Sequence, residues 1–251
     1  MYYTILGTQV RILGSLHFFP ESAAGGLPSR VEHALKYPDY IWLEHPPKDL
    51  APEGFQPSGA TLNGQIPPEL WGLLVAAYVP DVLPDQLARL KLWRALLGLT
   101  GRVLKTRPGV EEQIQARLTQ MQRRAEFIET AGELAALLDA VPLDDGIKAL
   151  RMALDRRDLA QADFEALYAA WVQGDPVKVD AVMQTMPIAG ISSMYEAVFE
   201  RRNQTWAQRV QKHLVPAGQK ILLVVGAGHL VGRGNLLSHL RAEGLESALI
   251  E

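Results

Sequence analysis

A stretch near the C-terminal end decides the fold of this chain: residues 221–229 read ILLVVGAGH. Five consecutive apolar residues are typical of a strand that is buried on both faces of a sheet. The glycines that follow permit a tight turn of the backbone, and the stretch ends on His229. A second stretch, residues 10–17, reads VRILGSLH and repeats this pattern of strand, glycine and histidine, ending on His17.

Each stretch closes with the motif Gly-x-x-His, at residues 14–17 and 226–229. Open α/β sheets hold their ligands just beyond the carboxyl ends of the strands. The two histidines are therefore expected to meet in one site that the fold assembles, although the motifs lie near opposite ends of the chain.

Both ends of the chain carry the pattern of an α/β sheet. The expected elements are strands over residues 1–6, 10–13, 40–44, 221–225 and 247–250 and helices over residues 28–35 and 230–243. The first two strands are expected to pair as a hairpin, with Gly7 and Thr8 in the turn.

The middle of the chain has a different pattern. A loop rich in proline and glycine is expected at residues 46–59, and from about 67 to 215 the apolar residues recur at helical spacing. One short strand is expected there, over residues 125–129. We therefore predict a single α/β domain over the whole chain. Its expected parts are a mixed-sheet α/β/α core built from residues 1–45 and 216–251 and a large, mostly helical insertion at about residues 66–215.

The composition narrows the class of protein. Apolar residues make up 48% of the 251, which is enough for a substantial core, and there is no cysteine for a disulfide, a thiolate nucleophile or a cysteine zinc site. A net charge of −3 without a basic run argues against a nucleic-acid partner. The first residues do not have the pattern of a signal peptide, and no apolar stretch is long enough to cross a bilayer. We therefore expect a cytoplasmic protein that acts on a peptide or small molecule, in an oligomeric state that the sequence leaves open.

Polar residues at special positions extend the candidate site. Glu44 ends an almost continuously apolar strand, where a carboxylate is well placed to be a ligand or a general base. On a helix expected over residues 195–214, the apolar stripe puts Arg202 and Asn203 on the buried face. A buried guanidinium needs an anion, which Glu44, another carboxylate or the substrate would supply. In the alternative, Arg202 extends past Trp206 to solvent.

Two further glutamates are secondary candidates. Glu111 lies at the start of a helix, where acids also favour the positive end of the helix dipole, and Glu129 ends the short strand expected in the middle of the chain. The remaining histidines are expected to have surface or packing roles: His33, His45, His213 and His239.

Several motifs in order resemble those of the TraB/GumN family. The matching residues are Leu13 to His17, Leu27 and Pro28 with Val31 and Ala34, Trp42 to Glu44, Gly109 to Glu111, Phe127 to Thr130, Ala170 and Trp171 with Gly174 and Asp175, Arg202 and Asn203 with Trp206, and Val225 to Leu230 with Gly232. This family is related to the Tiki-type membrane metalloproteases and, more distantly, to erythromycin-esterase and ChaN-like folds. The chain departs from it in three ways: the first motif more often reads Gly-Thr-x-His, Glu111 stands where Asp is usual, and most bacterial members have an exported leader.

The resemblance implies a metal-dependent hydrolase, and peptide bonds are the expected substrate. It implies that His17, His229 and Glu44 hold a manganese or cobalt ion, and that Arg202 and Asn203 belong to a further motif. The chemistry of these residues also suits zinc. Such an ion would activate water, and Arg202 or Asn203 would stabilise the developing oxyanion.

Three alternatives remain open. Gly226, Gly228 and Gly232 resemble a dinucleotide-binding turn, for which Glu251 would be the only acid suited to a ribose. The ChaN likeness suggests a haem-binding module. The third alternative is a non-catalytic interaction protein that uses the helical insertion.

Overall fold

The computed structural model describes residues 1–251 except 24, 47 and 251. Glu251, the acid that the dinucleotide-binding alternative requires, lies outside the described residues. None of the described helices is long and apolar enough to cross a membrane.

A mixed sheet of six strands forms the centre of the molecule, as predicted. In sheet order its strands are β6 (Glu126–Phe127), β4 (Tyr40–Leu43), β7 (Ile221–Gly226), β2 (Val10–Ser15), β1 (Tyr2–Ile5) and β8 (Ser247–Leu249). Strands β6, β4, β7 and β2 are parallel, and β1 pairs antiparallel with both β2 and β8. The expected hairpin is therefore confirmed, and the two ends of the chain lie side by side because β2 pairs with β7.

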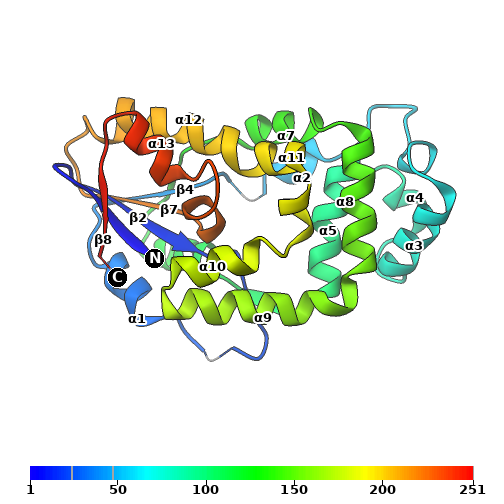
Figure 1. The fold of residues 1–251 in the computed structure, drawn as a ribbon, viewed down its shortest axis with the longest axis horizontal. Helices are drawn as coiled ribbons and strands as arrows, with labels where there is room; N and C mark the ends of the chain where they lie inside the picture. The colour runs from blue at the N-terminus through cyan, green and yellow to red at the C-terminus, as the bar shows by residue number, and fades with distance from the viewer. Residues whose placement is uncertain (24, 47, 251) are drawn as a thin grey trace.

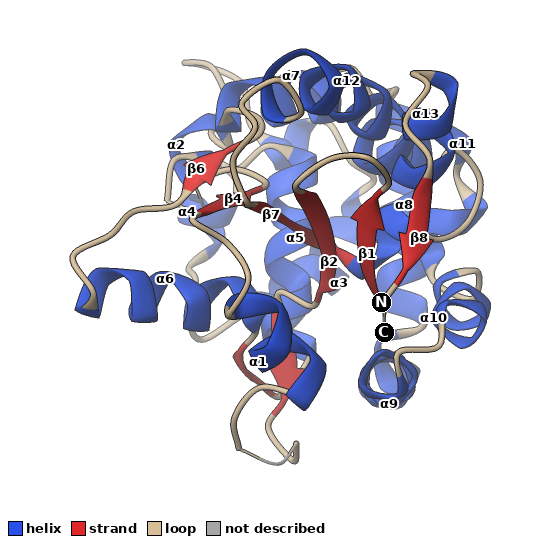
Figure 2. Cartoon of the chain, turned by 90° about the vertical axis from the view of Figure 1, so that its left-hand side faces the viewer, coloured by secondary structure: helices blue, strands red, loops and turns tan. Residues whose placement is uncertain are grey.

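Helices cover both faces of the sheet (Figure 2). On one face lie α7 (Ala131–Asp139), α12 (Arg201–Arg209) and α13 (Leu236–Ala242); on the other lie α1 (Ser29–Leu35), α6 (Val110–Gln120), α9 (Arg157–Gln173) and α10 (Pro176–Met183). The apolar side chains of all these helices except α7 join those of the sheet in the largest core cluster, in which Trp171 and Trp206 are fully buried. Those of α7 form a smaller cluster with Leu50 and Trp93. The predicted α/β/α architecture is confirmed, and segments from the middle of the chain supply part of both outer layers.

The other helices extend beyond the sheet, at the right of Figure 1. They are α2 (Leu50–Glu53), α3 (Pro68–Tyr78), α4 (Pro84–Leu87), α5 (Leu92–Val103), α8 (Leu143–Asp155) and α11 (Ser192–Tyr195), with short helical turns η1 (Leu62–Gly64) and η2 (Pro187–Gly190). A second apolar cluster, centred on Leu70, Leu74 and Leu150, joins α3, α5 and α8. The division of the chain into a core and an insertion within one domain stays a prediction.

Three details differ from the sequence-based expectations. A two-stranded sheet, β3 (Phe18–Pro20) with β5 (Thr106–Pro108), was not expected, because three residues are too few to show a strand period. The loop at 46–59 contains the short helix α2. The helix expected from residue 230 begins only at Leu236, since Gly232 and Gly234 adopt positive φ angles that interrupt helical backbone.

The helix that carries Arg202 is longer than expected. It begins at Ser192 as α11, continues through the π-helical turn η3 (Glu196–Glu200) and α12, and ends in a second π-helical turn, η4 (Val210–Leu214). Such turns change the direction in which successive side chains point, and they are frequent at functional sites.

Candidate functional site

The carboxyl ends of three parallel strands lie together at one edge of the sheet. Strand β7 lies between β2 and β4, so His17, Glu44 and His229, which follow these strands, are brought to the same edge. Nε2 of His17 lies 3.9 Å from Oε1 of Glu44, and Nε2 of His229 lies 3.7 Å from the same oxygen. Glu44 therefore stands between the two histidines of the Gly-x-x-His motifs.

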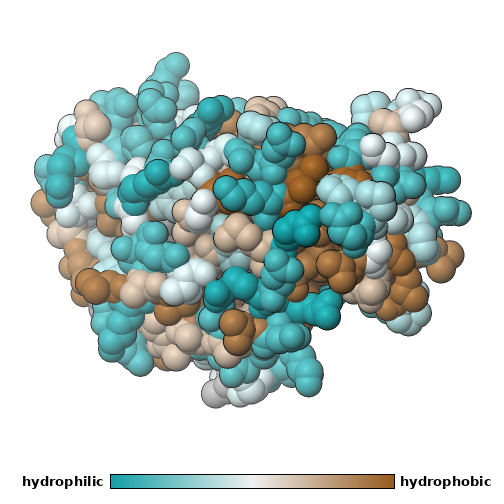
Figure 3. All heavy atoms as spheres, turned by 45° about the vertical axis from the view of Figure 1, so that its right-hand side comes forward, coloured by the Kyte–Doolittle hydropathy of each residue, from teal (hydrophilic) through white to brown (hydrophobic). Residues whose placement is uncertain are grey.

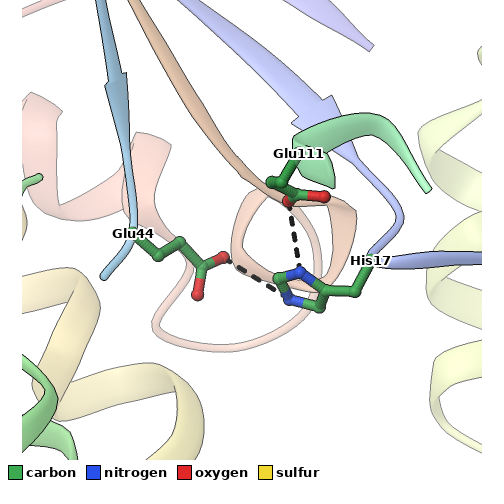
Figure 4. A group of neighbouring side chains, drawn as sticks. All are labelled: His17, Glu44 and Glu111. Atoms are coloured by element: carbon green, nitrogen blue, oxygen red, sulfur yellow. Dashed lines mark ion pairs between the residues drawn. The ribbon is translucent and has the colours of Figure 1, made fainter. Parts of the chain in front are cut away.

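Glu111 contacts the other ring nitrogen of His17 (Figure 4). Its Oε1 lies 3.3 Å from Nδ1 of His17, and the hydroxyl of Ser15 donates to the same oxygen. The second oxygen, Oε2, is buried and has no hydrogen-bond partner among the described residues. One oxygen of this carboxylate is thus held in place while the other is free to bind a ligand.

The start of α6 reaches this position because Gly109 has no side chain. The N–H of Gly109 donates to the carbonyl of His17 at 3.1 Å, and that of Val110 to the carbonyl of Leu16 at 2.9 Å. A Cβ atom on Gly109 would overlap the carbonyl oxygens of Leu16 and His17. The glycine therefore lets the helix pass against the backbone that follows β2, which brings Glu111 to His17.

Both oxygens of Glu44 are held by hydrogen bonds. Oε1 accepts from the backbone N–H of Gly226 at 2.6 Å, and Oε2 accepts from Nη2 of Arg202 at 2.5 Å. Burial alone would raise the pKa of Glu44, but the charge of Arg202, aided by protonated His17 and by the hydrogen bond from the N–H of Gly226, holds it well below its usual range. Glu44 is therefore ionised, as a ligand for a cation must be.

Arg202 is only 4% exposed, so it does not extend to solvent. Its Nε and Nη2 donate to Glu129 at 3.0 and 2.6 Å. Its Nη1 donates to the carbonyl of Val198 at 3.0 Å and to Nε2 of His229 at 3.1 Å. Together with the bond to Glu44, these contacts use all five N–H groups of the guanidinium.

Trp206 and Glu129 complete the surroundings of Arg202. The guanidinium carbon lies 4.5 Å from the centroid of the Trp206 ring, and the indole N–H donates to Oε2 of Glu129 at 3.0 Å. Glu129 follows β6, and its backbone N–H donates a hydrogen bond to the carbonyl of Glu44. The next residue, Thr130, caps α7 together with Glu133. The secondary candidate Glu129 is therefore the buried counter-ion of Arg202.

His229 is neutral. Its Nδ1 lies 2.7 Å from Oδ1 of Asn203, whose amide nitrogen donates to the carbonyl of Gly234 at 2.8 Å. This orientation of the amide assigns the imidazole proton to Nδ1 and leaves a lone pair on Nε2. Burial lowers the pKa of His229 to about 3, with Arg202 acting in the same direction and Glu44 against it.

His17 has the opposite protonation state. The charge of Glu111 raises the pKa of His17 to about 9, against the effect of burial. The ring is 54% exposed, so solvent screens part of this attraction. At neutral pH the two motif histidines therefore differ, one protonated beside two carboxylates and the other neutral beside an arginine.

Gly226 leaves a space between these groups. A Cβ atom on it would lie 3.3 Å from Oε1 of Glu44, 3.5 Å from Nε2 of His17 and 3.7 Å from Cδ2 of His229. The space is bordered by carboxylate oxygen and imidazole nitrogen, which are the donor types that divalent ions such as Mn²⁺, Co²⁺ and Zn²⁺ accept. These residues therefore fit a metal ion.

Among the residues that the structure describes, two groups of side chains have ligand atoms close enough to share an ion. One is His17, Glu44 and Glu111, whose ligand atoms all lie within 4.8 Å of one another; the other is Glu44, His45 and Glu129. The sequence ranked Glu111 below His229 and gave His45 a surface or packing role. It missed Ser15 and Gly226, although both stand inside the two Gly-x-x-His motifs.

Comparison with known proteins agrees with the motifs. The model of the TraB/PrgY/gumN family matches residues 6–247, nearly the whole chain. No curated protein and no solved structure matches the sequence or the fold. On the family match, the chain belongs to the TraB/PrgY/gumN family.

Proposed function

We propose that this chain is a metal-dependent hydrolase, most consistent with a peptidase, and that its divalent ion is held by His17, Glu44 and Glu111. The observation that carries the proposal is that the ligand atoms of these three side chains lie within 4.8 Å of one another. They come from three separate segments of the chain. The two glutamates contact the exposed imidazole of His17, which a substrate can approach.

Two features of the site support an ion there. The buried Oε2 of Glu111 has no hydrogen-bond partner among the described residues, and a buried carboxylate oxygen without a partner is costly. The space left by Gly226 lies beside Glu44 and His17. A divalent ion in such a site lowers the pKa of a water molecule and polarises the carbonyl group of a substrate.

The contacts of Arg202 and Asn203 favour positioning roles. Every N–H of Arg202 is engaged, and Asn203 spends its oxygen on His229 and its nitrogen on Gly234. Arg202 therefore cannot donate to a substrate without first giving up a bond. Arg202 holds Glu44 in its ionised form and orientation, and Asn203 holds the ring of His229. A direct role for either in stabilising an oxyanion remains the prediction made from the sequence.

His229 is the third ligand that the sequence predicts, in place of Glu111. Its Nε2 has the lone pair that coordination requires and lies 3.7 Å from Oε1 of Glu44. That lone pair accepts from Arg202, so coordination by His229 would have to break the bond to Arg202. This is the reason to propose Glu111 first.

The test is a calorimetric titration of chelator-treated protein with Mn²⁺, Co²⁺ and Zn²⁺. We expect about one ion per chain for the wild type and no binding by the double variant His17→Ala/Glu44→Gln. The single variants Glu111→Gln and His229→Gln identify the third ligand, because only loss of a ligand should weaken binding at least tenfold. His213→Ala removes an exposed histidine that lies outside both motifs and is the control.

A screen of a peptide library follows, with the ion that binds most tightly. Cleavage that requires the ion and is lost in Glu44→Gln supports the peptidase. A correctly folded wild type that binds no ion would refute the metal mechanism, and ion binding without cleavage of any peptide would refute the peptidase assignment.

A further inference from the structure

A cavity of about 390 Å³ lies outside the metal-ligand cluster. Helices α5, α8 and α9 form most of its wall, which is almost entirely apolar. Met186, which precedes the turn η2, Ile188 in that turn and Met194 in α11 add to it. Figure 3 shows apolar surface gathered on this side of the molecule among more hydrophilic surroundings. Its volume falls within the range of roughly 300–1,000 Å³ that is typical of pockets for small organic ligands.

Two residues of the wall connect the cavity to the candidate metal centre. Phe18 directly follows His17, and its side chain is 45% exposed. Val198 provides the carbonyl that accepts a hydrogen bond from Nη1 of Arg202. The chain segments that carry Phe18 and Val198 therefore contribute both to the cavity wall and to the candidate metal centre.

The charges in the wall are already paired with each other. Nη2 of Arg156 donates to Asp163 at 2.9 Å, and both residues line the cavity. The remaining lining side chains are apolar except for Thr100. The guanidinium of Arg156 keeps one buried N–H, on Nε, without a partner among the described residues. The described wall otherwise offers an occupant hydrophobic contact and no unpaired charge, which favours an uncharged apolar group.

We propose that this cavity binds an apolar group of the substrate, and that the bond to be hydrolysed then lies at His17 and Glu44. The position of the bond to be hydrolysed rests on the proposed hydrolase function. The cavity adds the substrate class: a peptide or amide that carries a long acyl chain or a large apolar side chain. Exposed Phe18 and Leu97 at the wall provide apolar surface along which such a group enters.

The first test concerns the cavity alone and needs neither metal nor catalysis. The probe is N-phenyl-1-naphthylamine, an uncharged apolar dye whose fluorescence rises when it leaves water. We expect saturable binding by the wild type and at least tenfold weaker binding by Ala160→Trp, which fills the cavity from α9. The matched control is Leu159→Trp, at the neighbouring position, where the side chain is 54% exposed and does not line the cavity.

A second filling variant, Ala153→Trp on α8, serves if Ala160→Trp does not fold. The double variant His17→Ala/Glu44→Gln should bind the dye as the wild type does, because it leaves the cavity unchanged. Equal affinity of the wild type and both folded filling variants for the dye would overturn the proposal.

The second test links the cavity to the ion site. In the presence of Mn²⁺, dodecanoyl hydroxamate should bind at least tenfold more tightly than acetohydroxamate, since both present the same chelating group and only the first has an apolar chain. Ala160→Trp should abolish this difference and leave the affinity for acetohydroxamate unchanged. No advantage of the long chain would overturn the link between cavity and site. If the protein binds none of Mn²⁺, Co²⁺ and Zn²⁺, the hydrolase proposal fails, while the dye experiment still decides whether the cavity binds apolar groups.

Discussion

The backbone N–H of Gly226 donates a 2.6 Å hydrogen bond to Oε1 of Glu44, which joins the ends of the neighbouring strands β7 and β4. The second Gly-x-x-His motif thus orients the carboxylate through its first residue as well as supplying His229. The same glycine leaves the space beside Glu44 and His17. Gly226 therefore contributes to the candidate metal centre in two ways: its N–H orients Glu44, and its lack of a side chain leaves space beside Glu44 and His17.

The first prediction concerns that space. Gly226→Ala keeps the backbone N–H, and the φ and ψ angles of −53° and 138° are accessible to alanine. The added methyl group would lie 3.3 Å from Oε1 of Glu44 and 3.5 Å from Nε2 of His17. We expect metal affinity to fall at least tenfold, as measured by calorimetry, while the midpoint of thermal unfolding changes by only a few degrees. Gly132→Ala, whose new methyl group meets open space, is the control. Unchanged metal affinity in Gly226→Ala would show that the ion does not use this space.

The second prediction concerns the buried arginine. Arg202→Met leaves Glu44 and Glu129 buried without their counter-ion, so we expect the free energy of unfolding to fall by about 3–5 kcal/mol. The triple variant Arg202→Met/Glu44→Gln/Glu129→Gln removes the unpaired charges and should recover most of this loss. Urea denaturation measures both, and Arg201→Met, an exposed neighbour on α12, is the control. A loss below about 1 kcal/mol for Arg202→Met would contradict a buried ion-pair network.

The third prediction concerns the proton on His17. Because Glu111 raises the pKa of His17 to about 9, the metal-free ring is protonated at neutral pH. An ion that binds this ring must displace the proton, so metal affinity should rise with pH up to about 9, and binding at pH 7 should release roughly one proton. Calorimetry in buffers of different ionisation enthalpy measures the release.

Glu111→Gln provides the independent check on the metal-free protein. It removes the largest cause of the shift, so an NMR titration should show the pKa of His17 falling towards its ordinary value of 6.5. A wild-type His17 that titrates near 6.5 would contradict the contact with Glu111.

The fourth prediction concerns stability in acid. Hydrogen bonds from Arg209 lower the pKa of Glu133 to about 2, from an ordinary value of 4.5. Since the folded state favours the carboxylate, the pair stabilises the fold above about pH 4.5, and this contribution is lost as the pH falls towards 2. The side chain of Glu133 is 45% exposed, so solvent limits the effect to about 1 kcal/mol or less. Urea denaturation of Glu133→Gln should therefore differ from the wild type at pH 7 but not near pH 2. Glu112→Gln on α6 should match the wild type at both pH values.

The strands that hold the site were predictable because they are buried on both faces. Strands β2, β4 and β7 read as nearly continuous apolar runs, which are typical of strands in a parallel sheet covered on both faces. The pairing of β3 with β5 and the late start of α13 were not predictable by the same means. A three-residue strand has no period to detect, and the positive φ angles of Gly232 and Gly234 become visible only in the folded backbone.

The sequence by itself determined that His17, Glu44 and His229 each follow a strand, because local hydrophobicity marks where a buried strand ends. Only the tertiary structure decided which side chains these residues meet. Glu111 reaches His17 through the packing of α6 against the backbone after β2, and Arg202 is buried between Glu44 and Glu129 instead of extending to solvent. The apolar cavity likewise exists only where α5, α8 and α9 come together. The physical reason is that an apolar pattern reports the burial of a segment, whereas the partner of a buried polar group depends on the strand order and helix packing of segments far apart in the chain.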